Sequence, residues 1–385
     1  MTAQDGNSSF CPGAEHSDQI NVALVSKYAP GGIGGIESHL EMVLKHVQTP
    51  SCACIPVMSG GARESLRFIQ RLMRCRGELV HFHGFDRLQL LTLMMFVRRR
   101  IPLVVTPHNG VNGAVYDRNA VRRLAKRWAD GVLFPVLIRQ RARVIALTVE
   151  ERDYYLTRFP GCGHLLEVLP NPIEAHRQAP LLSAPGPVRL LALARLDPCK
   201  HIEDLVSAMA LLPPDVECDI AGPECGAAAA LHDQARQVAR TIRFHGAVRG
   251  AEKERLFDEA TIVVVPSKAE GLSTVALEAL ARGMPVVVSD CASRGLPAEG
   301  VYQYPFGSVA DLAWTIEYLL AGEHLVEARR AARRASAELL GYDDYARVLR
   351  SLYRVSVERH RSGTTAHATD HWRRVRAARR ERRQA

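Results

Sequence analysis

Several common kinds of segment are missing from this chain of 385 residues. No pair of Cys-x-x-Cys elements occurs, and the nine cysteines are scattered, so reduced thiols are expected rather than a disulfide framework or a zinc site. The longest apolar stretch worth testing as a membrane span, residues 88–97, has half the length that a helix needs to cross a bilayer. The first 17 residues are polar and include Pro12 and Gly13, which argues against a secretory signal. These absences lead us to expect a cytoplasmic protein.

Familiar nucleotide and nucleic-acid motifs are missing as well. The glycine-rich segment near the start is followed by no Gly-Lys-Ser/Thr, which excludes a Walker loop, and it does not form the G-x-G-x-x-G dinucleotide fingerprint. No helix-turn-helix, zinc-finger or RNP-like pattern is present. A nucleic-acid-binding protein is therefore only a distant alternative, supported by its arginines alone.

The positive charge of the chain is concentrated in two regions. The formal net charge is +9 at pH 7. Residues 60–143 contain 17 Lys or Arg against five Asp or Glu, and the last fourteen residues contain seven Arg against one Glu. A basic first half attracts anions such as phosphate headgroups, lipid pyrophosphates or nucleic acid. The alternative is that these arginines simply lie on solvated helix faces.

Strand-like and helix-like segments alternate along the chain, which predicts an α/β protein with parallel sheets. The length suits two domains, and a proline-rich stretch at residues 170–187 predicts the hinge between them. The predicted strands before the hinge are residues 20–25, 54–58, 78–83, 103–106, 143–148 and 165–170. The predicted strands after it are residues 188–194, 218–222, 241–246, 261–266 and 285–290.

The domain boundaries follow from this alternation. We expect a loose tail at 1–17, a first domain at 18–175, a second domain of the same class at 176–341, a helix at 342–360 and a basic tail at 361–385. The helix carries its apolar residues on one side, at helical spacing. These residues are Tyr345, Val348, Leu349, Leu352 and Tyr353.

The most informative segment is residues 270–278, which read E-G-L-S-T-V-A-L-E and follow the apolar strand T-I-V-V-V-P-S. A loop that leads into a helix presents free backbone N–H groups and the positive end of the helix dipole, which together hold a diphosphate. Glu270 lies in the predicted loop and Glu278 on the helix, and carboxylates accept hydrogen bonds from hydroxyls. A bare pair of glutamates at this spacing is more often a solvated helix face. The strand, helix and strand from Ile262 to Asp290 favour a site for a sugar joined to a nucleotide.

Three other elements place polar residues after predicted strands. Glycines at 31, 32, 34 and 35 allow close approach of a ligand to the backbone before a helix, although a purely structural turn is the alternative. His108 follows the strand L-V-V-T, at the edge where open α/β sheets bind ligands, and His81 and His83 end the preceding strand. A lone histidine is otherwise usually structural. Arg195 and Lys200 follow a strand of the second half, where two cations neutralise a departing diphosphate.

Taken in this order, the four elements resemble those of retaining glycosyltransferases of the E-x7-E group, known as glycosyltransferase family 4 or "glycosyl transferases group 1". The group includes sucrose synthases, mannosyltransferases and bacterial polysaccharide glycosyltransferases. The resemblance covers nearly all of residues 18–360 and implies the GT-B architecture, two facing Rossmann-like domains with the helix at 342–360 crossing back onto the first. One departure is His201, which stands where the group usually has glycine after the lysine of its R-x4-K element.

The resemblance also implies roles for individual residues. The catalytic residues would be His108, Glu270, Arg195 and Lys200. The donor would be bound by Gly34, Gly35, Arg195, Lys200, Gly271, Leu272, Ser273, Thr274 and Glu278. Within these sets, His108 and Glu270 would contact the transferred sugar, Glu278 would hold the ribose hydroxyls, and the nucleotide base would lie near Val248. Glu37, His39 and His83 would lie on the acceptor side.

No Asp-x-Asp occurs in the sequence, the pattern through which another glycosyltransferase architecture anchors its diphosphate on a divalent cation. Arg195 and Lys200 would replace that ion, so neither a metal nor a cofactor is expected. Retention proceeds by front-face attack or through a covalent intermediate. No unambiguous nucleophile is present, and the resemblance favours front-face attack.

The expected donor is a UDP- or GDP-sugar, and the expected acceptor is the hydroxyl of a glycan, such as a lipid-linked glycan of cell-surface polysaccharide synthesis. The basic first domain suggests peripheral contact with an anionic membrane on its cytoplasmic face, and no nucleic acid is expected as a partner. A sugar-nucleotide epimerase or a phosphorylase of the same two-domain shape is the alternative among enzymes.

Overall fold

The structure is a computed structural model that describes residues 19–26, 32, 34–58, 77–84, 101–108, 121, 124, 131, 134–181 and 187–362. Several predictions fall outside these residues. They are the tail at 1–17, nearly all of the basic tail at 361–385, the apolar segment at 88–97 and most of the basic region at 60–143.

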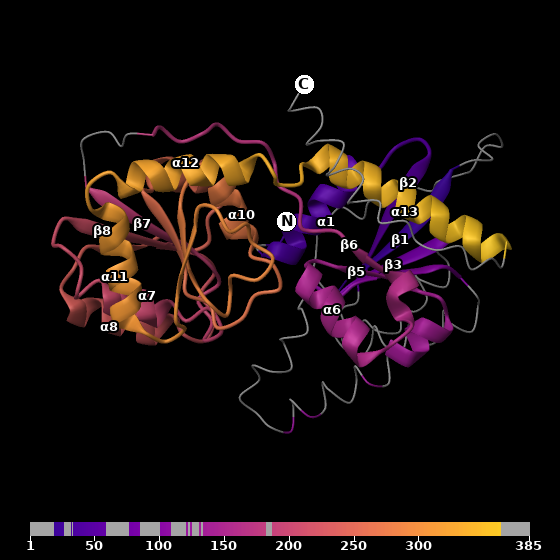
Figure 1. The fold of residues 1–385 in the computed structure, drawn as a ribbon, viewed down its shortest axis with the longest axis horizontal. Helices are drawn as coiled ribbons and strands as arrows, with labels where there is room; N and C mark the ends of the chain where they lie inside the picture. Colours follow the sequence, from indigo (N-terminus) through magenta and orange to yellow (C-terminus); the bar gives the residue numbers. More distant parts are fainter. Residues whose placement is uncertain are drawn as a thin grey trace, which may run out of the picture.

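Two parallel six-stranded sheets form the two lobes seen side by side in Figure 1. The first sheet has the strand order β2-β1-β3-β4-β5-β6. Its strands are β1 (Ile20–Ser26), β2 (Cys52–Met58), β3 (Leu79–His83), β4 (Leu103–Thr106), β5 (Arg143–Ala146) and β6 (Leu166–Val168). The helices associated with it are α1 (Gly35–His46) and α6 (Val149–Arg158), with the short 3-10 helix η1 (Cys162–Leu165) before β6.

The second sheet has the order β12-β11-β10-β7-β8-β9. Its strands are β7 (Val188–Leu193), β8 (Val216–Ala221), β9 (Ile242–Phe244), β10 (Ile262–Val265), β11 (Val286–Ser289) and β12 (Val301–Tyr304). Its helices are α7 (Ile202–Ala208), α8 (Ala228–Val238), α9 (Gly250–Glu259), α10 (Thr274–Ala281), α11 (Val309–Leu320) and α12 (His324–Ser336). This arrangement confirms the predicted class, two Rossmann-like domains in a GT-B architecture.

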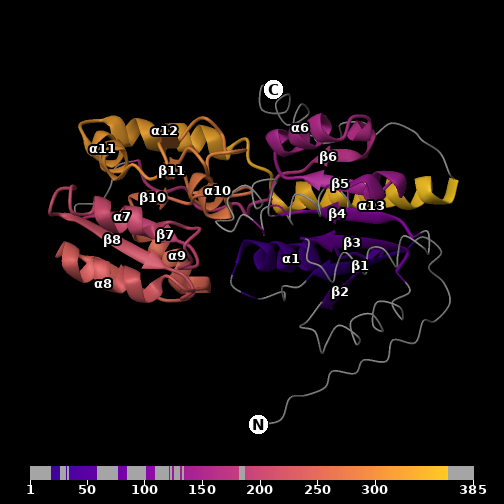
Figure 2. The ribbon, with the colours of Figure 1, turned by 90° about the horizontal axis from the view of Figure 1, so that it is seen from below.

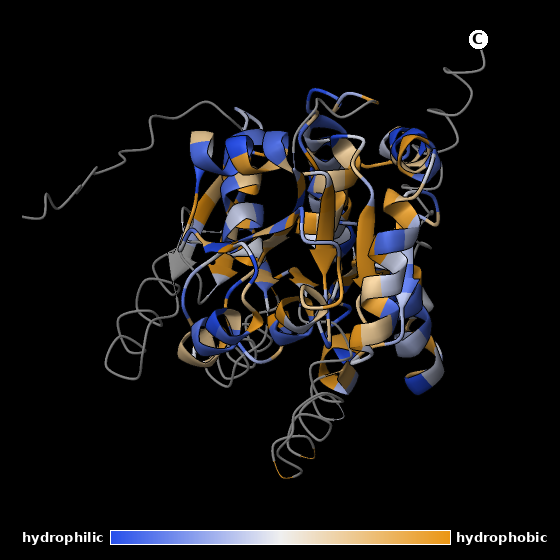
Figure 3. Cartoon of the chain, turned by 90° about the vertical axis from the view of Figure 1, so that its left-hand side faces the viewer, coloured by the Kyte–Doolittle hydropathy of each residue, from blue (hydrophilic) through white to orange (hydrophobic). Residues whose placement is uncertain are grey.

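Burial explains why these segments form strands. The central strands β4, β5, β10 and β11 are buried along their whole length, as expected of strands covered by helices on both faces. In Figure 3 the strands are mostly apolar and the helices carry hydrophilic residues on their outer sides.

None of the helices among the described residues is both long and apolar enough to span a bilayer.

Each sheet has one point at which the strand order reverses. In the first sheet the chain passes from β1 to β2 on one side and then to β3 on the other. In the second sheet β7 leads to β8 on one side, and the chain later returns to β10 on the other. Loops that leave the carboxyl ends of strands at such a reversal diverge, and open α/β sheets bind ligands there.

Helix α13 (Tyr342–Ser362) crosses from the second domain to the first. Figures 1 and 2 show it running along the first lobe, where it packs against α1, β3 and β4. The five apolar residues predicted to share one side are all buried in a core cluster of the first domain. The predicted crossover is confirmed, because a helix with one apolar stripe must bury that stripe against another element.

The two domains also touch through a small apolar cluster. Leu147 and Ile173 contribute to it from the first domain, and Leu272 and Leu277 from the second. The Ile173 N–H donates to the Leu340 carbonyl at 2.8 Å, so the two chain segments that connect the domains are joined to each other. The loops after β7 and β10 are thereby held near the first domain.

Candidate active site

The loops that follow β7 and β10, on either side of the reversal in the second sheet, meet through a salt bridge. Lys200 Nζ lies 2.6 Å from Glu270 Oε1, and the Ser267 hydroxyl donates to the same oxygen at 2.7 Å. The backbone joins these loops as well, since the Lys268 N–H donates to the Cys199 carbonyl at 2.9 Å. The side chains of Lys200 and Glu270 keep exposed fractions of 20% and 16%, which leaves both open to a ligand.

Helix α10 begins directly after this loop and points its amino end toward the first domain. The Ser273 hydroxyl caps the helix by accepting the Ala276 N–H at 3.3 Å. A Cβ built on Gly35, the first residue of α1, would lie 3.5 Å from Thr274 Oγ1, the first residue of α10. The amino ends of two helices, one from each domain, therefore meet, and both favour an anion.

Arg195 leaves the carboxyl end of β7 with its side chain 48% exposed. Its guanidinium pairs with Asp197 at 3.4 Å, within the same loop. Gly222 supports this loop from below: its φ of +151° and its close approach to the Ala194 carbonyl leave no room for a side chain. Arg195 is thus the more exposed of the two predicted cations, and Lys200 is the one whose acidic partner, Glu270, comes from the neighbouring loop.

His201 has a left-handed backbone, with φ of 52° and ψ of 39°, as the residue that precedes α7. Glycine adopts this conformation at no steric cost, and histidine is among the few other residues enriched there. The imidazole lies beside a carboxylate of the following turn, with Nδ1 3.0 Å from Asp204 Oδ2. The departure from glycine at this position therefore keeps the conformation that a glycine would adopt.

Glu278 lies one turn into α10 and is paired with a residue that the sequence analysis did not single out. Lys253, on the first turn of α9, places Nζ 2.7 Å from Glu278 Oε2. The next residue along, Glu254, accepts two hydrogen bonds of 2.8 and 2.7 Å from Arg282, which follows the last residue of α10. The cation Lys253 of α9 therefore lies against the Glu278 carboxylate.

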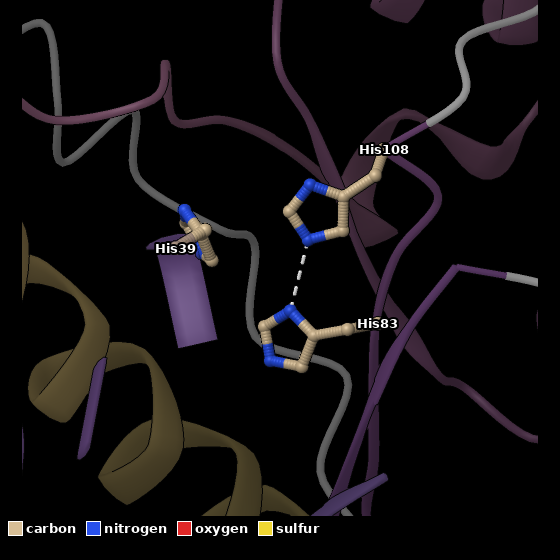
Figure 4. A group of neighbouring side chains, drawn as sticks. All are labelled: His39, His83 and His108. Carbon is tan, nitrogen blue, oxygen red and sulfur yellow. Dashed lines mark hydrogen bonds between the residues drawn. The ribbon is translucent and has the colours of Figure 1, made fainter. Parts of the chain in front are cut away.

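Three histidines gather at the carboxyl edge of the first sheet, as Figure 4 shows. His39 comes from α1, His83 ends β3 and His108 follows β4. Nδ1 of His83 lies 2.9 Å from Nε2 of His108, and one ring nitrogen from each of the three residues lies within 4.8 Å of the other two. All three are buried, with exposed fractions of 5%, 0% and 9% for His39, His83 and His108.

Burial controls the charge of these imidazoles. Desolvation lowers the pKa of His39 to about 4, and it lowers the pKa of His83 and His108 well below the usual value, with repulsion between neighbouring histidines adding to the effect. The three rings are therefore neutral near pH 7. His108 also has a left-handed φ of 54°, a conformation that is uncommon for a residue with a side chain and is found preferentially at functional sites.

The remaining predicted site residues have diverse positions. The Glu37 carboxylate lies against Gly34, where a Cβ would clash with it. The Leu272 side chain is buried at the domain contact, and its carbonyl accepts a hydrogen bond from Asn171 of the first domain at 3.2 Å. Val248 is buried in the core of the second domain, so its side chain is turned away from solvent.

His81 belongs to the structural support of this edge. It is fully buried, and both of its ring nitrogens form hydrogen bonds. Nδ1 lies 2.7 Å from the Tyr353 hydroxyl, and Nε2 lies 2.8 Å from the Thr106 hydroxyl. Ser267, Lys253 and Asn171 are the residues near the site that the motifs did not indicate.

Two family models match the chain, one on each domain. Residues 22–177 match the model described as Glycosyltransferase Family 4, and residues 187–322 match the model described as Glycosyl transferases group 1. Together they cover more than half of the sequence. The chain belongs to the GT-B glycosyltransferases. No curated protein matches the sequence of this glycosyltransferase closely enough to count as a relative.

Solved structures share the fold of the glycosyltransferase. Anabaena Alr3699/HepE in complex with UDP and glucose is 16% identical, with a TM-score of 0.72 over 88% of this chain and all of its own. The sucrose-phosphate synthase of Thermosynechococcus elongatus is 20% identical, with a TM-score of 0.69 over 88% of this chain and 99% of its own. A glycosyltransferase from Rickettsia africae is 14% identical, with a TM-score of 0.61 over 89% and 99% of the two chains. At these identities the likeness concerns the fold alone.

Proposed function

We propose that this glycosyltransferase transfers a sugar, with retention of its anomeric configuration, from a nucleoside diphosphate donor to an acceptor hydroxyl. The observation that carries the proposal is the contact of Lys200 with Glu270 at 2.6 Å, beside the amino end of α10. A cation, a hydroxyl-binding carboxylate and a helix amino end lie within one pair of loops. This combination matches a pyrophosphate attached to a sugar.

The charges of the site suit a diphosphate leaving group. As the bond between the sugar and the β-phosphate breaks, negative charge grows on the phosphate oxygens. Fixed positive potential for that charge comes from Lys200, Arg195 and the amino ends of α1 and α10. Stabilising the leaving group therefore requires no reorganisation of water. Lys200 and Ser267 both contact Oε1 of Glu270, so the other carboxylate oxygen can accept hydrogen bonds from hydroxyls of the sugar.

The first domain contributes His108. A neutral imidazole makes a polar contact to the sugar without repelling the positive charge that develops at its ring, and the low pKa of His108 keeps it neutral. We infer front-face attack by the acceptor rather than a covalent intermediate, with Glu278 and Lys253 binding the nucleoside side of the donor. The proposal includes no metal ion, since Arg195 and Lys200 supply the positive charge.

UDP-sugars are the first donors to test, because Alr3699/HepE structures contain UDP-glucose and UDP and share this fold. The purified protein is incubated with a panel of UDP- and GDP-sugars and with glycan or lipid-linked glycan acceptors, and products are detected by mass spectrometry. We expect one donor class to be consumed only when an acceptor is present, with the anomeric configuration retained in the product. An inverted product would contradict the proposal.

The leaving-group role is tested with Arg195→Ala combined with Lys200→Ala. We expect kcat to fall by about 10²-fold or more, the magnitude seen when preorganised charge stabilisation is removed. Unchanged kinetics would remove the basis of the proposal. Donor consumption without a glycoside product would favour an epimerase, and a strict phosphate requirement would favour a phosphorylase.

A membrane-bound acceptor, such as a polyprenyl-pyrophosphate-linked glycan, is the further part of the proposal. It rests on the concentration of Arg and Lys in residues 60–143, since basic surfaces bind anionic lipid. Flotation with anionic and with neutral vesicles tests it. We expect binding to anionic vesicles only, and absence of binding to both would count against a peripheral membrane location.

A further inference from the structure

The His39, His83 and His108 cluster has a composition that goes beyond a contact to the sugar. Three neutral imidazoles from three different elements place one ring nitrogen each within 4.8 Å of the others. Among the residues that the structure describes, no carboxylate belongs to the cluster. Imidazole ligands suit zinc and neighbouring transition metals, whereas magnesium and calcium require oxygen ligands.

The geometry is close to that of a three-histidine zinc site. Zinc holds imidazole nitrogens at about 2.0–2.1 Å, which in a tetrahedral site puts the nitrogens about 3.4 Å apart. His83 Nδ1 and His108 Nε2 are 2.9 Å apart and need to separate slightly. The other ring-nitrogen separations are at most 4.8 Å, so they need to close by no more than about 1.4 Å, a movement that side-chain rotation supplies.

An unpartnered nitrogen of His39 provides a second, independent observation. Within the described part of the chain, His39 Nδ1 is buried and has no hydrogen-bond partner. Burying such an atom without a partner costs free energy. In His39 the other nitrogen, Nε2, contacts the Tyr345 hydroxyl at 3.0 Å. When that Nε2–H donates to Tyr345, Nδ1 carries a lone pair, which is how outer partners fix the tautomer of metal-binding histidines.

We propose that His39, His83 and His108 bind a zinc ion, and that the bound ion inhibits sugar transfer. Inhibition rests on the proposed function, because an ion held by His108 removes that imidazole from its contact with the sugar. Metal binding itself does not rest on it. The ion takes three protein ligands and leaves a fourth position for solvent.

Metal binding is measured with cobalt, which fills zinc sites and absorbs visible light. We expect one equivalent of Co²⁺ per chain, with the strong bands of tetrahedral coordination, no thiolate charge-transfer band, and displacement by Zn²⁺. His39→Gln and His83→Gln, each checked for folding by its thermal midpoint, should bind at least tenfold more weakly. His324→Gln is the matched control, because His324 lies at the start of α12 in the other domain.

Three results would overturn the site: no tetrahedral spectrum in the parent protein, an undiminished spectrum in both cluster variants, or a thiolate band. Inhibition is measured for each protein as the ratio of its turnover with zinc to its turnover without zinc. A change in basal activity therefore does not alter the comparison between variants. The ratio should be well below one in the parent protein and in His324→Gln, and close to one in His83→Gln. If the protein transfers no sugar, the cobalt titration still decides the metal site, so the two failures are distinguishable.

Discussion

The hydroxyl of Tyr345 lies 3.0 Å from Nε2 of His39, although 306 positions separate the two residues in the chain. Tyr345 belongs to the crossover helix α13 and is buried, as is His39. Tyr353, two turns further along α13, makes the matching contact to His81 at 2.7 Å. Helix α13 therefore braces the histidines at the carboxyl edge of the first sheet.

Removing this brace should cost stability. In Tyr345→Phe the His39 Nε2 atom stays buried without a partner, which costs about 1–3 kcal/mol. We expect the thermal midpoint to fall by several degrees. Tyr318→Phe is the control, because Tyr318 is an exposed residue of α11 and should leave the midpoint unchanged. Equal midpoints for both variants would show that the contact contributes nothing.

Lys200 and Glu270 should act as a unit in a double-mutant cycle. Lys200→Ala is expected to lower kcat about 10²- to 10³-fold, because it removes a preorganised charge from the leaving group. Glu270→Gln should also lower kcat, and the double variant should lose less than the product of the two single losses, since the side chains are in contact at 2.6 Å. The exposed pair Arg334 and Glu299, 2.7 Å apart, serves as control and should leave kcat unchanged. Strictly multiplicative losses at Lys200 and Glu270 would mean that the two act separately.

Metal removal should not abolish activity. We expect EDTA to leave turnover unchanged or to raise it, because Arg195 and Lys200 supply the charge that a metal provides in other phosphate-leaving reactions. Steady-state rates are compared before chelation, after it, and after adding Mg²⁺ or Mn²⁺ back. Loss of turnover that magnesium or manganese restores would contradict the metal-independent mechanism.

Glu151 should make stability fall as pH rises. Burial raises the pKa of its carboxyl from 4.5 to about 7, although the Leu147 N–H donates to it at 2.8 Å. Between pH 4.5 and about 7 the unfolded chain ionises this group while the folded chain keeps it protonated. The contribution of Glu151 to the free energy of unfolding is therefore fully present below pH 4.5 and decreases as the pH rises to about 7. The total loss is at most about 3 kcal/mol. Thermal midpoints across this range should decline less in Glu151→Gln than in Glu150→Gln, an exposed neighbour; parallel declines would refute the assignment.

The backbone strain at His201 should appear as a difference in stability between the variants His201→Ala and His201→Gly. With φ at 52°, His201→Gly is expected to be more stable than His201→Ala by about 1 kcal/mol, because only alanine pays for the left-handed conformation. At the exposed helical position Glu317 in α11 the order should reverse, since glycine weakens a helix interior. Thermal midpoints of the four variants check both orders. The same order at both positions would contradict the assigned backbone.

Much of the fold was predictable, because parallel strands buried on both faces read as continuous apolar runs. Residues 261–266 and 285–290 were predicted as strands for that reason, and they contain β10 and β11. β12, with the sequence V-Y-Q-Y, was missed because it lies at the edge of its sheet and carries an exposed polar residue. The crossover helix was predicted from its single apolar side.

The site was predictable only in part. Residues after strands were accessible to sequence reasoning, because parallel strands direct their carboxyl ends to one edge, and this indicated His108, Arg195, Lys200 and Glu270. The partners of the predicted site residues Glu278 and Leu272 could not be predicted from the sequence. Lys253 reaches Glu278 across 25 positions, and Asn171 reaches the Leu272 carbonyl across 101. No local pattern encodes such pairs.

The sequence by itself determined the alternating units, the two domains of one class and the polar residues at strand ends, because these depend on local periodicity and strand direction. Only the tertiary structure decided that Lys200 pairs with Glu270, that Gly35 faces Thr274, and that three histidines from α1, β3 and the end of β4 meet. The reason is physical: such contacts depend on the packing of whole elements and domains, and packing distances are not written in the spacing of residues along the chain.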